Sequence, residues 1–354
     1  MLCKAKRLLF TFMVLALLGI SVAYPFMHSL TPPSVVFPGK GYDEEVKRLF
    51  NEVLEGVSKV RGLEFRRPVK IEVVTKEWVL KNWGVKSVRE ERERIRVEET
   101  LYKALLLIPR EENLTRAMLG FSGMIVAATV SDTVYVVREY FNPREKKARR
   151  ILAHELVHVL QGHHFRPPEL KTHDQKQAWN ALIEGDADFT ADLYVKMTDC
   201  PSPPAPLRAI PKPVLEIMLF PYDYGKAFVT RLYERGGWGA VNRAYENPPR
   251  STEQVMHPEK YLSGEMPACL TPPVLSVKDM KLAKSDSLGE HFVFVLVKTW
   301  LGEEEGELAS EGWNGDNVTI YINETDYLVT WLTGWDLSLI HISEPTRPRL
   351  ISYA

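Results

Sequence analysis

Hydrophobic residues recur every three to four positions between residues 43 and 60, on a stripe formed by Val46, Leu49, Phe50, Val53 and Val57. This period predicts an amphipathic helix. Residues 69–74 instead alternate between apolar and polar side chains, which predicts a half-buried strand. Residues 124–130 and 133–137 predict two further strands, paired around Ser131 and Asp132.

Helical patterns dominate the rest of the chain. A charged helix that becomes apolar at its end is predicted at residues 87–107, and helices prevail from 143 to 245. Strand patterns return at 318–322 and 327–329. This distribution favours an α+β fold with a mainly helical core and a small mixed β-sheet.

The first thirty residues follow the pattern of an export segment. Lys4, Lys6 and Arg7 precede an apolar run that extends through Met27. A basic start followed by an apolar stretch is typical of a secretory signal peptide, and the run is also long enough for a membrane anchor. Both alternatives stay open, and both place the remainder outside the membrane, secreted or at the extracellular face.

We expect a Pro/Gly-rich linker at residues 31–41 and one domain from 42 to 336. Residues 337–354 resemble the translation of a transposase adapter, with two constant pieces on either side of three arbitrary residues. We interpret this segment as an artefact, expect the natural sequence to break off near Asp336, and exclude His341 from the candidate site.

Charge and cysteine content add limited information. The formal net charge is −1, so no nucleic-acid partner is expected. Of the three cysteines, Cys3 precedes the apolar run, while Cys200 and Cys269 lie in Pro-rich segments. In an oxidising compartment these two are candidates for a disulfide, and two unpaired thiols are the alternative.

The candidate chemistry lies in the sequence His-Glu-Leu-Val-His at 154–158, within a helix that is apolar nearly all round. We expect Asn142 to cap this helix and Gly162 to end it. Buried His154, Glu155 and His158 need a compensating partner. The two histidines share one helix face and can bind one zinc ion, whereas Glu155 is rotated towards a metal-bound water.

A third ligand is required, and two candidates compete. His164 lies where the longer HExxHxxGxxH pattern has its third histidine, but Gln161 occupies the position of the glycine. Glu184 is the alternative, on a helix that Thr172 and Gln175 begin with a capping box. Asp188 follows Glu184 on the same face, and a buried pair of carboxylates needs a cation nearby. Neighbouring Gly185 is expected to allow close approach of the two helices.

The sequence resembles the gluzincin metallopeptidases, whose prototype is thermolysin, over about residues 144–194. That family joins HExxH to a downstream glutamate and to an aspartate four residues later. The resemblance implies a zincin-like fold and Zn²⁺ held by His154, His158 and Glu184. It also implies that Glu155 activates the water and that Asp188 orients His154.

A second resemblance is to uncharacterised exported archaeal and bacterial proteins. They combine HExxHxxQ, an EGDA-type helix and a later STEQxxHP segment, which here is 251–258. Because gluzincins use a His or Tyr to stabilise the oxyanion, His257 is the first candidate for that role, with Tyr222 and Tyr224 as weaker ones.

The expected function is that of an exported or membrane-anchored zinc peptidase acting on a peptide or protein substrate. An extended substrate could add to the edge of the strand at 124–130 or of that at 133–137. One alternative is a non-catalytic binding or structural module with a structural zinc, for which His163 or His164 would join the other ligands. Zinc-dependent hydrolysis of a non-peptide bond is a further alternative that uses the same residues.

Overall fold

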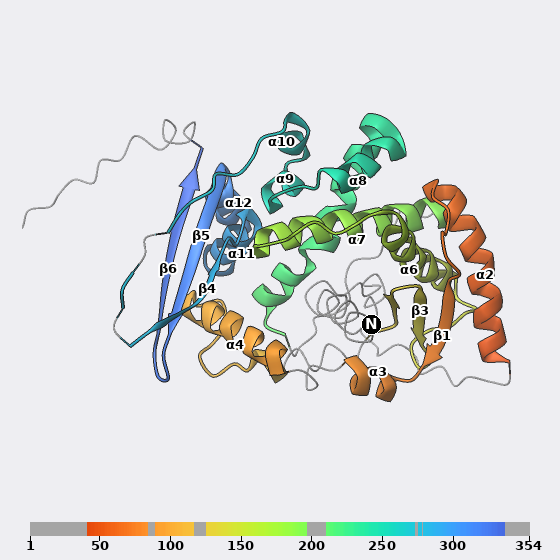
Figure 1. The fold of residues 1–354 in the computed structure, drawn as a ribbon, viewed down its shortest axis with the longest axis horizontal. Coiled ribbons are helices and arrows are strands. Elements are labelled where there is room, and N and C mark those ends of the chain that lie inside the picture. The colour runs from red at the N-terminus through yellow and green to blue at the C-terminus, as the bar shows by residue number, and fades with distance from the viewer. Residues whose placement is uncertain are drawn as a thin grey trace, which may run out of the picture.

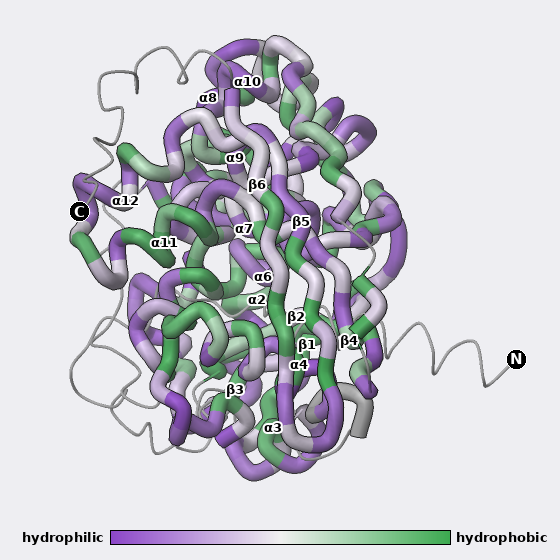
Figure 2. Tube along the Cα trace, turned by 90° about the vertical axis from the view of Figure 1, so that its left-hand side faces the viewer, coloured by the Kyte–Doolittle hydropathy of each residue, from purple (hydrophilic) through white to green (hydrophobic). Residues whose placement is uncertain are grey.

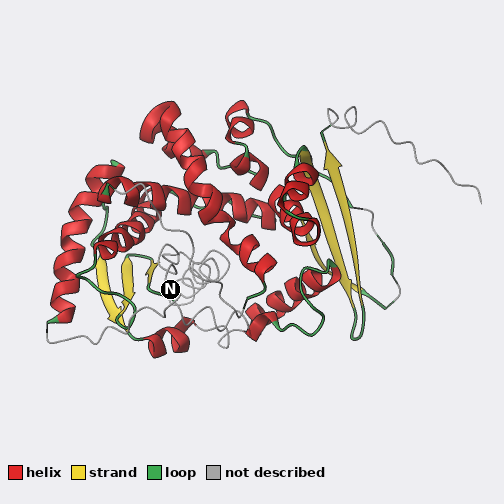
Figure 3. Cartoon of the chain, turned by 180° about the vertical axis from the view of Figure 1, so that it is seen from behind, coloured by secondary structure: helices red, strands yellow, loops and turns green. Residues whose placement is uncertain are grey.

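The computed structural model describes residues 41–83, 89–116, 125–196, 210–272, 275–277 and 279–336 (Figure 1). The predicted export segment, nearly all of the predicted linker and the adapter-like segment at 337–354 lie outside these residues. No helix in the described part of the chain is long and apolar enough to cross a membrane. The predicted α+β class is confirmed, with two small sheets at opposite ends of a helical centre (Figure 3).

The first sheet packs between helices near the N-terminal end of the domain. Helix α2 (Tyr42–Arg61) buries the whole predicted stripe. Strand β1 (Lys70–Val74) runs parallel to β3 (Thr133–Val137), and β2 (Ala127–Val130) pairs antiparallel with the other side of β3. The predicted pairing around Ser131 is therefore confirmed, and β3 is the central strand of a mixed sheet.

Three long helices form the centre of the molecule: α6 (Lys146–His164), α7 (His173–Val195) and α8 (Lys212–Glu246). Helix α7 runs from the second sheet towards the first and packs against both α6 and α8 (Figure 1). Helix α8 bends at Gly236 and Gly237, and Gly237 has the left-handed φ of 58° that favours glycine.

The close approach at Gly185 involves α8, not α6 as predicted. A Cβ on Gly185 would lie 2.1 Å from the carbonyl oxygen of Gly225, and one on Gly225 would lie 2.2 Å from that of Ala181. Successive residues of a helix are rotated by about 100°. Glu184 can therefore face α6 while Gly185 faces α8.

The second half of the domain surrounds the N-terminal end of α7. Strands β4 (Lys281–Asp286), β5 (Trp313–Ile322) and β6 (Tyr327–Trp335) form an antiparallel sheet in that order, which Figure 2 views face-on. The remaining elements are α3 (Lys76–Trp83), α4 (Arg89–Ala104), α9 (Thr252–Met256), α10 (Pro258–Ser263), α11 (Glu290–Leu301) and α12 (Glu303–Ser310).

Candidate metal centre

Helix α6 is enclosed by α2, α7 and the first sheet, so most of its side chains are buried. It begins at Lys146, later than predicted. The side chain of Asn142 accepts from the backbone N–H of Arg144, in a turn before the helix, and does not cap it. Gly162 does not end the helix, which continues to His164, because Arg66 donates to His163 Nδ1 and to its carbonyl oxygen in the last turn.

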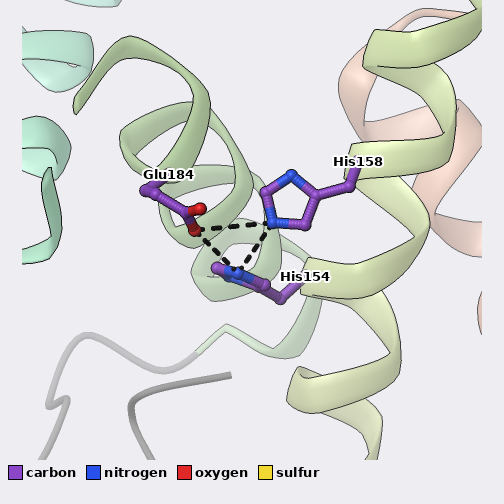
Figure 4. Close-up of side chains that lie close together, drawn as sticks. All are labelled: His154, His158 and Glu184. Atoms are coloured by element: carbon purple, nitrogen blue, oxygen red, sulfur yellow. Dashed lines mark hydrogen bonds and ion pairs between the residues drawn. The ribbon is translucent and has the colours of Figure 1, made fainter. Parts of the chain in front are cut away.

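Three side chains from α6 and α7 converge on one point (Figure 4). The Nε2 atoms of His154 and His158 lie 3.0 Å apart. Oε2 of Glu184 lies 3.2 Å from Nε2 of His154 and 3.5 Å from Nε2 of His158. Among the described His, Cys, Asp and Glu side chains, no fourth ligand atom joins this group.

These separations suit a tetrahedral zinc ion. Bonds of about 2.0–2.1 Å at tetrahedral angles place two donor atoms about 3.3 Å apart. Hydrogen bonds at Nδ1 favour the proton on that atom in both rings, which leaves unshared electron pairs facing one another at Nε2. Such pairs repel at 3.0 Å, so the arrangement calls for a cation or a proton between them.

A carboxylate orients the first histidine. Nδ1 of His154 lies 3.0 Å from Oδ1 of Asp188, which also accepts from Arg150 at 2.9 Å. Burial opposes a positive charge on His154, but Asp188 and Glu184 outweigh it and raise its pKa to about 10. Burial also opposes ionisation of Asp188, yet His154 and Arg150 hold its pKa below the usual range. The same negative field favours a metal cation.

Glu155 lies beside the ligands, fully buried. The hydroxyl of Thr129, on β2, lies 2.7 Å from Oε2 of Glu155 and 2.9 Å from its backbone carbonyl oxygen. The other carboxylate oxygen, Oε1, has no hydrogen-bond partner among the described residues. Burial raises the pKa of Glu155, although the two histidines partly offset this. One oxygen is therefore held in place and the other is available to accept a proton.

The neighbouring histidines point elsewhere. Nε2 of His164 lies 2.7 Å from the carbonyl oxygen of Glu64, so this ring faces the loop between α2 and β1. Nε2 of His163 lies 2.9 Å from Oδ1 of Asp132. Of the two candidates for the third ligand, the structure brings Glu184 to the histidines and not His164.

The residues predicted to stabilise an oxyanion make contacts with other side chains. His257 lies between α9 and α10 and contacts Oε1 of Glu290 at 2.9 Å. Tyr224 packs against Phe220 and His291. Tyr222 is half-buried against the hydrophobic cluster that includes Tyr102 and Phe292. The oxyanion role of these three residues stays a prediction.

Two other groups of residues carry side chains that could serve metal or redox chemistry. Glu253, Glu265 and Asp336 gather around Nζ of Lys260, at 2.6, 2.8 and 3.1 Å. Because this ammonium group already lies between the three carboxylates, they give no case for a metal. Cys269 is exposed and Cys200 lies outside the described residues, so their pairing stays a prediction.

Two contacts of the site were not predicted from the sequence. Gln161 is the residue that replaces a glycine of one pattern and ends the HExxHxxQ of another, but neither pattern predicts that its Oε1 lies 2.8 Å from Nδ1 of His158. Its position three residues after His158 on a buried helix could have indicated this contact, because side chains at that spacing share a helix face. Nothing in the sequence links Thr129 to Glu155, because that contact joins a strand to a helix.

Comparisons with known proteins give two matches. A family model described as the eCIS core domain matches residues 122–166, which include β2, β3 and α6. A crystal structure from Chloroflexus aurantiacus, described as "a putative hydrolase with a novel fold", is similar at a TM-score of 0.44 and 14% identity. That likeness covers 70% of this chain and 97% of the other. No curated protein matches the chain.

Proposed function

We propose that this protein is a zinc-dependent hydrolase that cleaves peptide bonds. The observation that carries the proposal is the convergence of two imidazole Nε2 atoms and one carboxylate oxygen, in a buried site beside a further carboxylate. Two nitrogens and one oxygen form a typical ligand set for catalytic zinc, which keeps a fourth position for water or substrate. When bound, zinc would supply Lewis acidity and lower the pKa of a water molecule towards ~7.

Glu155 supports hydrolysis rather than a structural role for the metal. Its Oε1 can take the proton of the attacking water and later return it to the leaving amine. Thr129 holds Oε2 at 2.7 Å and so limits rotation of the carboxylate. A structural zinc site needs a fourth ligand and no such base.

The first sheet supports a peptide substrate. Of the two strands considered for edge addition, β3 has neighbours on both sides, whereas β2 pairs with β3 alone among the described strands. The same β2 carries Thr129, which contacts Glu155. An extended peptide that hydrogen-bonds to β2 would therefore run close to the proposed base.

The predicted export segment lies outside the described residues, so the location outside the membrane, with or without an anchor, remains part of the proposal. So does the expectation of a peptide or protein partner and no nucleic acid.

The proposal is tested by measuring bound zinc and cleavage of casein and peptide libraries for four proteins: wild type, Glu155→Gln, Glu184→Ala and the control His164→Ala. Wild type and His164→Ala should bind zinc and cleave. Glu155→Gln should bind zinc but lose about 10²–10⁴-fold in kcat. Glu184→Ala should lose zinc, because a ligand is removed.

Three results would contradict parts of the proposal. Zinc binding by Glu184→Ala at the wild-type affinity would remove Glu184 from the ligand set. Zinc bound by both wild type and Glu155→Gln, without cleavage by either, would favour a non-catalytic module. Cleavage of ester or amide model compounds but of no peptide would point to a different bond.

A further inference from the structure

The second histidine of the site is oriented by a neutral side chain and not by a carboxylate. Nδ1 of His158 lies 2.8 Å from Oε1 of Gln161, one turn later on α6. Gln161 is buried, with 6% of its surface exposed. Helix α6 thus carries both this ligand and the group that contacts the outer nitrogen of its ring.

The surroundings of Gln161 determine which end of its amide faces His158. Its Nε2 lies 2.9 Å from the carbonyl oxygen of Ile183 and 3.4 Å from Oδ2 of Asp186. Both neighbours accept hydrogen bonds, so the NH₂ group must face them. The amide oxygen therefore faces His158, where it can only accept, and the proton of the neutral ring belongs on Nδ1.

Asp186 is in turn fixed by residues from other helices. Arg61, the last residue of α2, binds both carboxylate oxygens through Nε at 2.7 Å and Nη2 at 3.0 Å. The hydroxyl of Tyr245, on α8, donates to Oδ2 at 2.7 Å. Arg61 and Asp186 are both fully buried. Three helices besides α6 therefore contribute to the orientation of one amide.

We propose that Gln161 is a positioning residue that holds His158 in its Nδ1–H form and so keeps Nε2 available to the metal. Asp186 and Arg61 maintain the amide in the orientation that this requires. The inference rests on the proposed metal site. It explains why a glutamine, where the longer zincin pattern has glycine, is compatible with this site.

The experiment compares zinc affinity, by competition with a chromophoric chelator, for the full-length wild type, Gln161→Leu and Gln177→Leu. The last variant is a matched control. Gln177 is also buried and donates to a backbone carbonyl, that of Ile217, but does not contact the metal ligands. Long-range ¹⁵N–¹H spectra of the zinc-loaded proteins report which nitrogen of His158 carries the proton.

Gln161→Leu should lower the affinity about 10–100-fold, the usual cost of removing a partner of a metal ligand. Gln177→Leu should bind zinc as wild type does. The zinc-loaded wild type should show His158 protonated at Nδ1, bound through Nε2.

Equal affinities for Gln161→Leu and Gln177→Leu would overturn the inference. If the Leu variant fails to fold, the wild-type spectrum still decides, since His158 bound through Nδ1 would contradict the proposal. A wild type that binds no zinc would instead refute the proposed function itself.

Discussion

The two ends of α7 both bury carboxylates, yet they compensate them differently. Near the N-terminal end, Oδ1 of Asp174 accepts from the N–H and the hydroxyl of Thr252, both at 2.7 Å. Burial outweighs these bonds and raises the pKa of Asp174 well above its usual range. Towards the other end, histidines lower the pKa of Glu184 and Asp188 despite burial.

Asp174 belongs to a structural polar cluster, whereas Glu184 and Asp188 belong to the candidate metal site. Asp174 can be neutralised by a proton, and Gly289 leaves room for it, because a Cβ there would lie 2.0 Å from Oδ1. Glu184 and Asp188 stay charged. Glu184 faces Nε2 of both rings, while Nδ1 of His154 contacts Asp188 and Nδ1 of His158 contacts Gln161. The convergence of two imidazoles and a carboxylate on one point favours a cation, whereas burial of a carboxylate alone does not.

The same substitution at both ends gives the largest expected contrast. Asp188→Asn keeps an oxygen for His154 but removes the negative charge, so zinc affinity should fall about 10–100-fold. Asp174→Asn keeps an acceptor for Thr252 and removes no charge if the aspartate is protonated. Its zinc affinity should be unchanged and its stability within about 1 kcal/mol of wild type.

Chelator competition and urea unfolding measure the two quantities. A loss of zinc affinity in Asp174→Asn comparable with that in Asp188→Asn would show that the two ends are not independent. An unchanged affinity in Asp188→Asn would contradict the role of Asp188 in orienting His154.

Much of the candidate site could be predicted from the sequence because its residues lie in pairs within single helices. The spacing of four from His154 to His158, and again from Glu184 to Asp188, determines which side chains share a face. That α6 and α7 face one another was implied by resemblance, and the structure brings their side chains together. The helical stripe of α2 and the β2–β3 pair were equally local patterns, and both are confirmed.

What could not be predicted depends on contacts between distant segments. Arg61 and Asp186 are 125 residues apart in the sequence, and neither side chain carries a signal for the other. The parallel pairing of β1 with β3 likewise joins strands that are separated by α3 and α4. The predicted boundaries of α6 were wrong at both ends. The side chain of Asn142 forms a turn with Arg144 instead of capping the helix, and Arg66 contacts His163 beyond the glycine that was expected to end it.

A second prediction concerns acid stability near the N-terminal end of α7. His291 is buried, with 3% of its surface exposed, and packs against Phe220 and Tyr224. Burial, together with the positive charges of His173 and Lys298, lowers its pKa to about 3. The unfolded chain binds a proton below about pH 6.5, whereas the folded chain does not until about pH 3. The stability that depends on a neutral His291 is therefore fully present above pH 6.5 and is lost as the pH falls towards 3.

His291 should therefore reduce the free energy of unfolding by roughly 2 kcal/mol between pH 7 and pH 5. His291→Phe should remove this part of the pH dependence, because phenylalanine does not titrate. Urea unfolding at both pH values, with chelator present to eliminate metal effects, tests it. Parallel pH profiles for the two proteins would mean that His291 titrates normally in the fold.

The smallest expected effect concerns the base beside the metal. Thr129→Val keeps the branched side chain that suits β2 but removes the hydroxyl that holds Oε2 of Glu155. Loss of one such hydrogen bond, worth about 1 kcal/mol, should lower kcat roughly fivefold. KM and zinc content should not change, since Thr129 is not a ligand, and Thr129→Ser should restore most of kcat. Thr133→Val, a similar change on β3 without a described contact to Glu155, is the control. A fall in zinc content instead of kcat would place Thr129 among the residues that support the ligands.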